Sequence, residues 1–268
     1  MKNNDKQNKS SICANQDFYK DENDDAQYSH ESLDFYAKIE PLFGFYDAYD
    51  RLYDIYIKQI YLLFKFKNRV DAPKPNMLDF GCGNGRFGSL LTPKFNVLGC
   101  DKSPKMLEIC KSIRTTNRSL QDIDAKFDLI TAVSDVLNYL DKNELMSFFA
   151  DSFEKLNEGG YLIFDVNTKF GFDEVASGSL YVKDMQNDLV IDAKFDKNML
   201  ETDFIYFAKN GDLYKRSVFH ITQYYHTSKD ILELSKASNL KQIKRLNVNL
   251  FSDHLADKVL YIFQKQFQ

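Results

Sequence analysis

The chain has 268 residues, with 39 acidic and 35 basic side chains, which is enough to bury one large core or two small ones. A formal net charge of −4 argues against general attraction to the phosphates of nucleic acids. No apolar run is long enough to cross a bilayer, and the polar N-terminus lacks the apolar stretch of a signal peptide. The four cysteines form no C-x-x-C pair, so neither a zinc site nor a disulfide framework is expected. These features predict a cytoplasmic protein that uses neither a membrane nor a metal.

The first 72 residues divide into two parts. Residues 1–27 are rich in Lys, Asn, Asp and Gln and are expected to form a mobile polar tail. Residues 28–72 are expected to form a helical cap, followed by a proline-containing linker at 71–75. One helix is indicated by aromatic and apolar residues spaced three and four apart, namely Tyr46, Tyr49, Tyr53, Tyr56, Ile60 and Leu63.

The most informative stretch is residues 78–85, Leu-Asp-Phe-Gly-Cys-Gly-Asn-Gly. An apolar strand runs into alternating glycines, and Phe87, Leu90 and Leu91 then follow at helical spacing. Such a turn lets the backbone approach a ligand, and the N–H groups of the helix start are expected to face it. A dinucleotide-binding fingerprint would need glycine at position 86, which is Arg86.

Further strand and helix boundaries follow up to residue 167. One strand ends on Asp101, and Ser103 can cap a helix that begins at Pro104. A buried strand at 127–133 leads into residues 134–140, and Asp141 and Glu144 fit a capping box. The next helix is expected to stop on the glycines at 159–160, before a strand that ends near 165. This βαβα succession predicts a doubly wound, mostly parallel α/β sheet.

The chain after residue 167 predicts an antiparallel β insertion at 168–226. Three β-like stretches lie at 188–195, 200–207 and 213–225, with turns between them. The insertion is expected to form a lid over the carboxyl ends of the strands, where open α/β sheets bind ligands. Residues 227–268 are expected to add a helix, capped near Ser228, and two closing strands at 241–250 and 258–263.

The acid-x-Gly-x-Gly-x-Gly pattern, the Asp101 strand end and segments 127–140 and 159–167 together resemble the class I S-adenosylmethionine (SAM)-dependent methyltransferases. The β insertion is similar to that of their small-molecule subgroup, which includes amino-deoxysugar N-methyltransferases. The resemblance implies a seven-stranded Rossmann-like sheet with the SAM-binding core at 73–167. The third strand is short, so Asn117 or Asp122 would stand where the family has an acid that contacts adenine.

The resemblance also implies a set of SAM-binding positions. The glycine loop would hold the amino-acid and ribose part of SAM, Asp101 would accept the ribose diol, and a tyrosine would close over the cofactor. The implied positions are Tyr46, Asp79, Gly81, Cys82, Gly83, Asp101, Lys102, Met106, Asn117, Leu120, Val133 and Ser134.

The catalytic candidates are Asp135, Asp165 and His226, which follow predicted strands. A methyl group on a sulfonium is already activated, so an amine acceptor needs only to be neutral, whereas a hydroxyl needs a base. Asp165 could instead only orient the insertion, and His226 also fits a surface turn without chemistry.

These polar groups favour a small-molecule methyl acceptor, by N- or O-transfer. An RNA or protein methyltransferase and a non-catalytic SAM-fold interaction protein are the alternatives. The sequence does not name the acceptor, and it leaves both a monomer and a dimer open.

Overall fold

The computed structural model describes residues 30–65, 73–251 and 255–267. The predicted tail at 1–27 lies outside these residues. Within them, a seven-stranded sheet has the order β10-β11-β5-β4-β1-β2-β3. Strands β1 to β5 are parallel to one another, and β11 runs antiparallel to both of its neighbours, β5 and β10. The strands are β1 (Asn76–Phe80), β2 (Asn96–Cys100), β3 (Arg114–Thr116), β4 (Phe127–Ala132), β5 (Leu156–Asn167), β10 (Leu240–Val248) and β11 (Lys258–Lys265). The predicted doubly wound, mostly parallel sheet is confirmed, and β3 is as short as the sequence suggested.

Helices cover both faces of this sheet, which explains why its central strands are almost continuously apolar. On one face, α2 (Tyr46–Phe64) and α3 (Arg86–Leu91) bury residues such as Leu52 and Phe87. On the other, α5 (Lys142–Lys155) and α6 (Ser228–Ala237) bury Phe149 and Ile231. The short α4 (Pro104–Ile109) follows β2.

Several predicted helix ends are confirmed, and two differ. Ser103 caps α4 by accepting from the Met106 N–H, and Asp141 and Glu144 form the capping box of α5. However, the residue that caps α6 is Thr227, whose side chain accepts from the Asp230 N–H. Ser228 lies in the first turn of the helix and accepts a hydrogen bond from the Tyr261 hydroxyl at 2.8 Å.

The end of α5 also differs from the prediction. The helix ends at Lys155, and the following residue already has extended backbone. Gly159 and Gly160 lie within β5, where the register with β4 shifts between Phe127 and Leu129. Gly159 has a φ of +75°, so the glycines serve a bulge in the strand and not a helix stop.

The insertion is a second, four-stranded antiparallel sheet with the order β6-β7-β8-β9. Its strands, in the described part of the chain, are β6 (Gly178–Lys183), β7 (Asn187–Asp196), β8 (Met199–Asn210) and β9 (Leu213–Tyr224). Lys197 and Asn198 both have positive φ in the two-residue turn between β7 and β8, as tight hairpins require. The sequence missed β6, because this edge strand is almost wholly exposed and lacks an apolar alternation.

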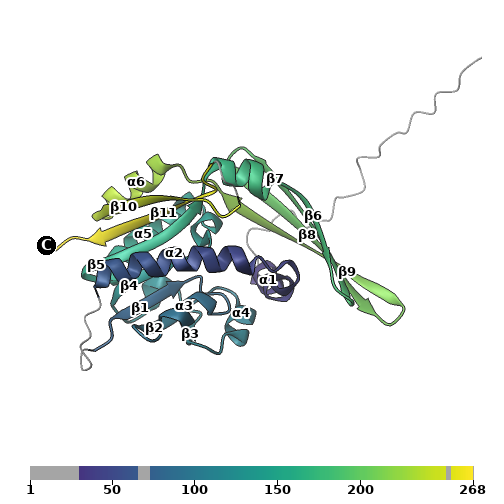
Figure 1. Cartoon of the computed structure of the whole chain (residues 1–268), viewed down its shortest axis with the longest axis horizontal. Coiled ribbons are helices and arrows are strands. Elements are labelled where there is room, and N and C mark those ends of the chain that lie inside the picture. The colour runs from purple at the N-terminus through teal and green to yellow at the C-terminus, as the bar shows by residue number, and fades with distance from the viewer. Residues whose placement is uncertain (1–29, 66–72, 252–254, 268) are drawn as a thin grey trace, which may run out of the picture.

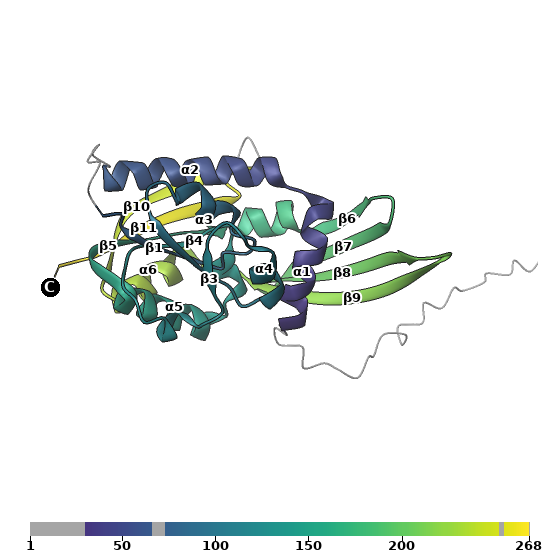
Figure 2. The same cartoon turned by 90° about the horizontal axis from the view of Figure 1, so that it is seen from below.

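Helix α1 (His30–Phe43) lies between the main sheet and the insertion, as both views show (Figures 1 and 2). Its Phe35 ring stacks on Phe219 with 3.6 Å between centroids, and it also meets Tyr206 edge to face. The insertion therefore buries its inner face against α1. The rest of this second sheet projects away from the core.

Candidate active site

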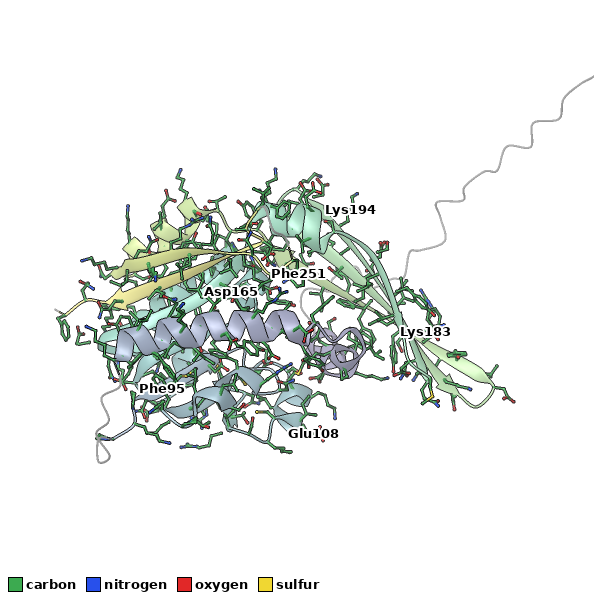
Figure 3. The ribbon with its side chains drawn as sticks, in the orientation of Figure 1. Phe95, Glu108, Asp165, Lys183, Lys194 and Phe251 are labelled. Carbon is green, nitrogen blue, oxygen red and sulfur yellow. The ribbon has the colours of Figure 1, made fainter. Side chains whose placement is uncertain are left out.

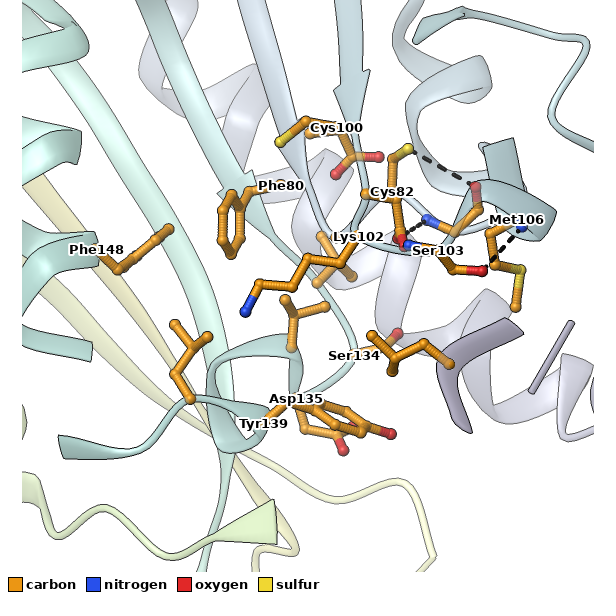
Figure 4. A pocket seen from close by; sticks show the side chains of 18 of the residues that line it. Phe80, Cys82, Cys100, Lys102, Ser103, Met106, Ser134, Asp135, Tyr139 and Phe148 are labelled. Atoms are coloured by element: carbon orange, nitrogen blue, oxygen red, sulfur yellow. Dashed lines mark hydrogen bonds between the residues drawn. The ribbon is translucent and has the colours of Figure 1, made fainter. Parts of the chain in front are cut away.

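A cavity of about 950 Å³ lies at the carboxyl ends of β1 to β4. Strand order reverses on the two sides of β1, and such a switch point leaves a crevice in open α/β sheets. The walls come from the glycine loop, residues 117–120, residues 133–136, α1, α2 and the end of β9. Figure 4 shows several of these side chains around the cavity.

The glycine loop after β1 has the conformation that its sequence requires. Gly81, Gly83 and Gly85 have φ of +70°, +52° and +79°, a region that other residues rarely adopt. A Cβ atom on Gly81 would lie 2.5 Å from Val136 Cγ1, whereas one on Gly83 would meet no atom within 4 Å. Gly83 is therefore the position where the backbone itself borders open space in the cavity.

The N–H groups of this loop are directed into the protein. Those of residues 81, 82, 83, 85 and 86 donate to the carbonyls of Cys100 and Cys82, to Asp101 and to the side chain of Asn84. Of the N–H groups at the helix start, which were expected to face the ligand, that of Arg86 instead donates to Asn84 Oδ1. A loop used in this way does not provide the N–H nest that binds phosphates, so it does not suit a dinucleotide.

Asp101 joins the end of β2 to the glycine loop. Its Oδ2 accepts from the Gly83 N–H and its Oδ1 from the Ser103 N–H, both at 2.8 Å. Burial raises the pKa of this carboxyl, and these N–H donors oppose that rise. Each carboxylate oxygen keeps acceptor capacity beyond one hydrogen bond, so Asp101 can also accept from a diol in the cavity.

Asp79 is the most deeply buried acid in the cavity wall. Its side chain is on β1, the residue is 1% exposed, and Oδ1 accepts from Thr131 Oγ1 at 2.9 Å. Oδ2 has no hydrogen-bond partner among the described residues. Burial, with a smaller effect of Asp101, raises the pKa of Asp79 to about 7. A positively charged ligand in the cavity would offset the negative charge of this buried carboxyl.

Eleven of the twelve predicted cofactor positions line the cavity; the exception is Tyr46. The Tyr46 ring instead faces the Arg86 guanidinium at 4.6 Å. Tyr49 and Tyr53, one and two turns further along α2, line the cavity in its place. Other lining residues that the sequence analysis did not select are Leu33, Tyr36, Glu40, Asn84 and Tyr139. The spacing of positions 33, 36 and 40 on one helical face was the signal available for α1.

Asp135 lines the cavity and belongs to a buried ionic cluster. Its Oδ1 lies 2.6 Å from Lys258 Nζ, and its Oδ2 accepts from Gln223 Nε2 at 2.8 Å. Lys258 also donates to Asn167 Oδ1 at 2.7 Å and lies 3.2 Å from Asp165 Oδ2. Lys258 was not a candidate from the sequence, although its place just before the apolar run 259–263 of β11 was a signal for a buried charge.

Asp165, labelled in Figure 3, lies on β5. It is fully buried and does not line the cavity. Its carboxylate accepts from the N–H groups of Ser134 and Asp135 at 2.8 Å and from the Tyr56 hydroxyl at 2.7 Å. Ser134 and Asp135 have φ of +66° and +52°, a costly conformation for residues other than glycine. Asp165 thus stabilises the strained turn that directs Asp135 to the cavity.

His226 also lies outside the cavity wall. It is 8% exposed, so its interpretation as a surface-turn residue is wrong. Nε2 lies 3.1 Å and 3.0 Å from the carbonyl oxygens of Leu137 and Leu140, so this nitrogen carries the hydrogen of the neutral ring. Burial lowers the pKa of His226, which keeps the ring neutral. Its contacts stabilise the segment after β4.

The family described as a methyltransferase domain matches residues 77–160. YqeM of Bacillus subtilis (strain 168), which is provisionally named a methyltransferase, is 30% identical over 193 residues, or 65% of this chain and 75% of its own. The chain therefore belongs to the SAM-dependent methyltransferase family, and SAM is its cofactor.

Two solved structures share the fold. A SAM-dependent methyltransferase from Clostridium acetobutylicum ATCC 824 has a TM-score of 0.71 at 22% identity, covering 88% of this chain and 99% of that one. The sugar N-methyltransferase KedS8 from Streptoalloteichus sp. ATCC 53650 has a TM-score of 0.68 at 15% identity. That match covers 99% of this chain and all of KedS8, so the fold likeness includes the insertion.

Two features are absent from the residues that the structure describes. None of their helices is both long and apolar enough to cross a bilayer. No group of three or more His, Cys, Asp or Glu side chains in residues 30–65, 73–251 and 255–267 is arranged to hold a metal ion.

Proposed function

We propose that this methyltransferase acts on an amine nitrogen of a small polar molecule. The observation that carries the proposal is the Asp135 carboxylate, which lines the cavity and is paired with buried Lys258. An anion in this position suits the N–H groups of an amine.

The residues around the cavity fit SAM along its length. The cavity runs from residues 117–120 after β3, past Asp101 and the glycine loop, to residues 133–136 after β4. Residues 117–120 would hold the adenine, Asp101 the ribose, and Asp79 with the open side of Gly83 the cationic amino-acid end. Bound SAM supplies a methyl group that its sulfonium has already activated.

The part of the cavity beyond β4 is the proposed acceptor site. Helix α1 contributes Tyr36, α2 contributes Tyr49, residues after β4 contribute Tyr139, and β9 contributes Ile221 and Tyr224. These elements lie around the acceptor site and would limit the access of water to it, which aids alignment of two reactants. A site lined by tyrosines from several elements favours a small molecule over a folded macromolecule.

The acceptor site favours nitrogen over oxygen because a proton acceptor of suitable strength is not evident among its described residues. Burial raises the pKa values of Tyr36, Tyr49 and Tyr139, so these phenols stay protonated at neutral pH. Both carboxylate oxygens of Asp135 already accept hydrogen bonds, Oδ1 from Lys258 and Oδ2 from Gln223. A neutral amine needs only orientation, which Asp135 provides by accepting its N–H.

The charge of the cavity wall argues against RNA. Seven lining side chains are acidic and two are basic, an arrangement that repels phosphates and suits a cationic cofactor. The acidic ones are Glu40, Asp79, Asp101, Asp135, Asp141, Glu144 and Asp151, and the basic ones are Lys102 and Arg118. The fold shared with KedS8, which is titled a sugar N-methyltransferase, also supports a small acceptor.

The test measures S-adenosylhomocysteine formed from SAM with a panel of small amines, with the matching hydroxyl compounds, and with folded RNA and protein. We expect turnover with an amine and none with its hydroxyl counterpart. Asp135→Asn should reduce kcat/KM for that amine about 10- to 100-fold, as loss of a charge-assisted hydrogen bond predicts.

The control variant is Asp203→Asn, an exposed acid of β8 paired with His220 in the insertion, which should keep wild-type kcat/KM. Turnover of a hydroxyl compound alone would refute nitrogen transfer. Turnover confined to RNA or protein would refute the small-molecule assignment.

A further inference from the structure

The Asp79 carboxyl has no counter-charge beside it among the residues that the structure describes. It lies on the central strand β1, opposite Gly99 of β2 and Thr131 of β4. Among the described residues, Thr131 Oγ1 donates the one well-formed hydrogen bond to this carboxyl, and the Gly88 backbone N–H is a weaker donor, although the residue is 1% exposed and borders the cavity. A buried carboxylate normally needs a cation or several donors.

The groups that face Asp79 from each neighbouring element supply no cation. They are Asp101 and Cys100 of the β2 end, Cys82 of the glycine loop, Tyr53 and Tyr56 of α2, Thr131 of β4 and Gly88 of α3. Burial raises the pKa values of the two thiols and two phenols, so all four are neutral at pH 7.

The nearest basic side chain on α3, Arg86, is engaged elsewhere. Its guanidinium donates to both carboxylate oxygens of Asp50 at 2.7 Å and 2.8 Å and faces the Tyr46 ring. The charge closest to Asp79 is thus the negative charge of Asp101. Both burial and this neighbour favour the neutral form of Asp79, and hydrogen bonds from Thr131 and the Gly88 backbone oppose them only in part.

We propose that Asp79 is partly protonated at neutral pH in the cofactor-free protein and releases this proton to solvent when positively charged SAM binds. The O–H bond of the carboxyl group breaks, the proton passes to buffer, and the carboxylate left behind becomes the counter-charge of the bound cation. This inference rests on the SAM cofactor and is independent of the proposed acceptor. It makes cofactor affinity depend on pH.

The size of the effect follows from linkage. With the Asp79 pKa near 7 in the free protein, about half of the molecules are protonated at pH 7. If the bound carboxyl stays ionised at pH 6, affinity should fall about tenfold between pH 8 and pH 6. The stability of the free protein changes with pH in the opposite direction to SAM affinity. The raised folded pKa means that the free protein loses stability as pH rises from about 4 to 7, and bound SAM offsets that loss.

The experiment is calorimetric titration of the full chain with SAM at pH 7, in three buffers of different ionisation enthalpy. The slope of the observed enthalpy against buffer enthalpy counts released protons. We expect the wild type to release about half a proton per SAM. The slope for Asp79→Asn should be lower than that of the wild type by this half proton. The matched control is Asp257→Asn, because Asp257 is an equally buried acid outside the cavity wall and should keep the wild-type slope.

S-adenosylhomocysteine, which keeps the ammonium but lacks the sulfonium charge, serves as a second titrant. Release with both ligands assigns the counter-charge to the ammonium, and release with SAM alone assigns it to the sulfonium; either supports the proposal. If Asp79→Asn does not fold, infrared difference spectra of the wild type should show loss of a protonated carboxyl band on SAM binding. An unchanged carboxyl band, or a wild-type slope equal to that of folded Asp79→Asn, overturns the proposal.

Discussion

Replacing Lys258 by methionine tests the ionic cluster behind the cavity wall. The change keeps the length and apolar stem of the side chain but removes an ammonium that lies 2.6 Å from Asp135 and 3.2 Å from Asp165. The Lys258 side chain is 8% exposed and that of Asp165 is fully buried. Two buried carboxylates would therefore lose their only neighbouring ammonium among the described residues.

The expected loss is about 3–5 kcal/mol in the free energy of unfolding, the usual cost of removing one partner from a buried ion pair. Urea unfolding followed by circular dichroism measures it. Lys102→Met is the matched control, because Lys102 forms a pair of similar length, 3.0 Å, with Glu144 at the surface. Both partners there are about half exposed, so the control should lose less than about 1 kcal/mol.

The pH dependence separates lost charge pairing from lost packing. Burial lowers the pKa of Lys258, but Asp135 and Asp165 more than compensate and raise it above its ordinary value. A raised lysine pKa stabilises the fold fully below the ordinary lysine value of about 10.5, and this contribution is lost as pH rises above that value. The methionine variant has no such group, so the deficit should be smaller at pH 11 than at pH 8.

The reasoning would be refuted if Lys258→Met lost no more stability than Lys102→Met. It would also be refuted by an equal deficit at both pH values, which would indicate packing alone.

Three further variants test other parts of the site. Asp101→Ala should weaken SAM binding at least tenfold by calorimetry, because it removes the diol acceptor and the clamp on the Gly83 N–H; unchanged affinity in the folded variant would contradict this. Gly81→Ala should lower the free energy of unfolding by about 2 kcal/mol or more, because the backbone there has a φ of +70° and the added Cβ would lie 2.5 Å from Val136 Cγ1. His226→Ala should cost about 1–3 kcal/mol by leaving two buried carbonyls without their donor, yet leave the shape of the pH–rate profile unchanged; a lost titration step would instead identify His226 as a base.

Local patterns predicted the elements that form the cofactor half of the site. Alternate glycines after a buried strand require a left-handed loop, and an acid at the end of the next strand lies beside that loop in a parallel sheet. The caps at Ser103 and Asp141 also depend only on nearby residues. These features are local in sequence, so periodicity and residue type were sufficient to place them.

The roles of the polar residues beyond the cofactor loop were decided by tertiary packing. Lys258 contacts Asp135, which is 123 positions away in the sequence, and Tyr56 contacts Asp165, which is 109 positions away. Neither contact can therefore be predicted from a short spacing. Residue type alone made Asp165 and His226 candidates for catalysis, whereas the packing of β11, α2 and the segment after β4 buries both behind the cavity wall.

The rotation of α2 also decided which tyrosine reaches the cavity. The spacing of its stripe predicted the helix, but Tyr46 at its start turns toward Arg86, while Tyr49 and Tyr53 face the cavity. The sequence by itself determined the fold class and the SAM-binding frame, because glycine conformation, capping and strand burial are local requirements. The lining of the acceptor site depended on how α1, α2 and β9 pack together, and that arrangement exists only in the folded chain.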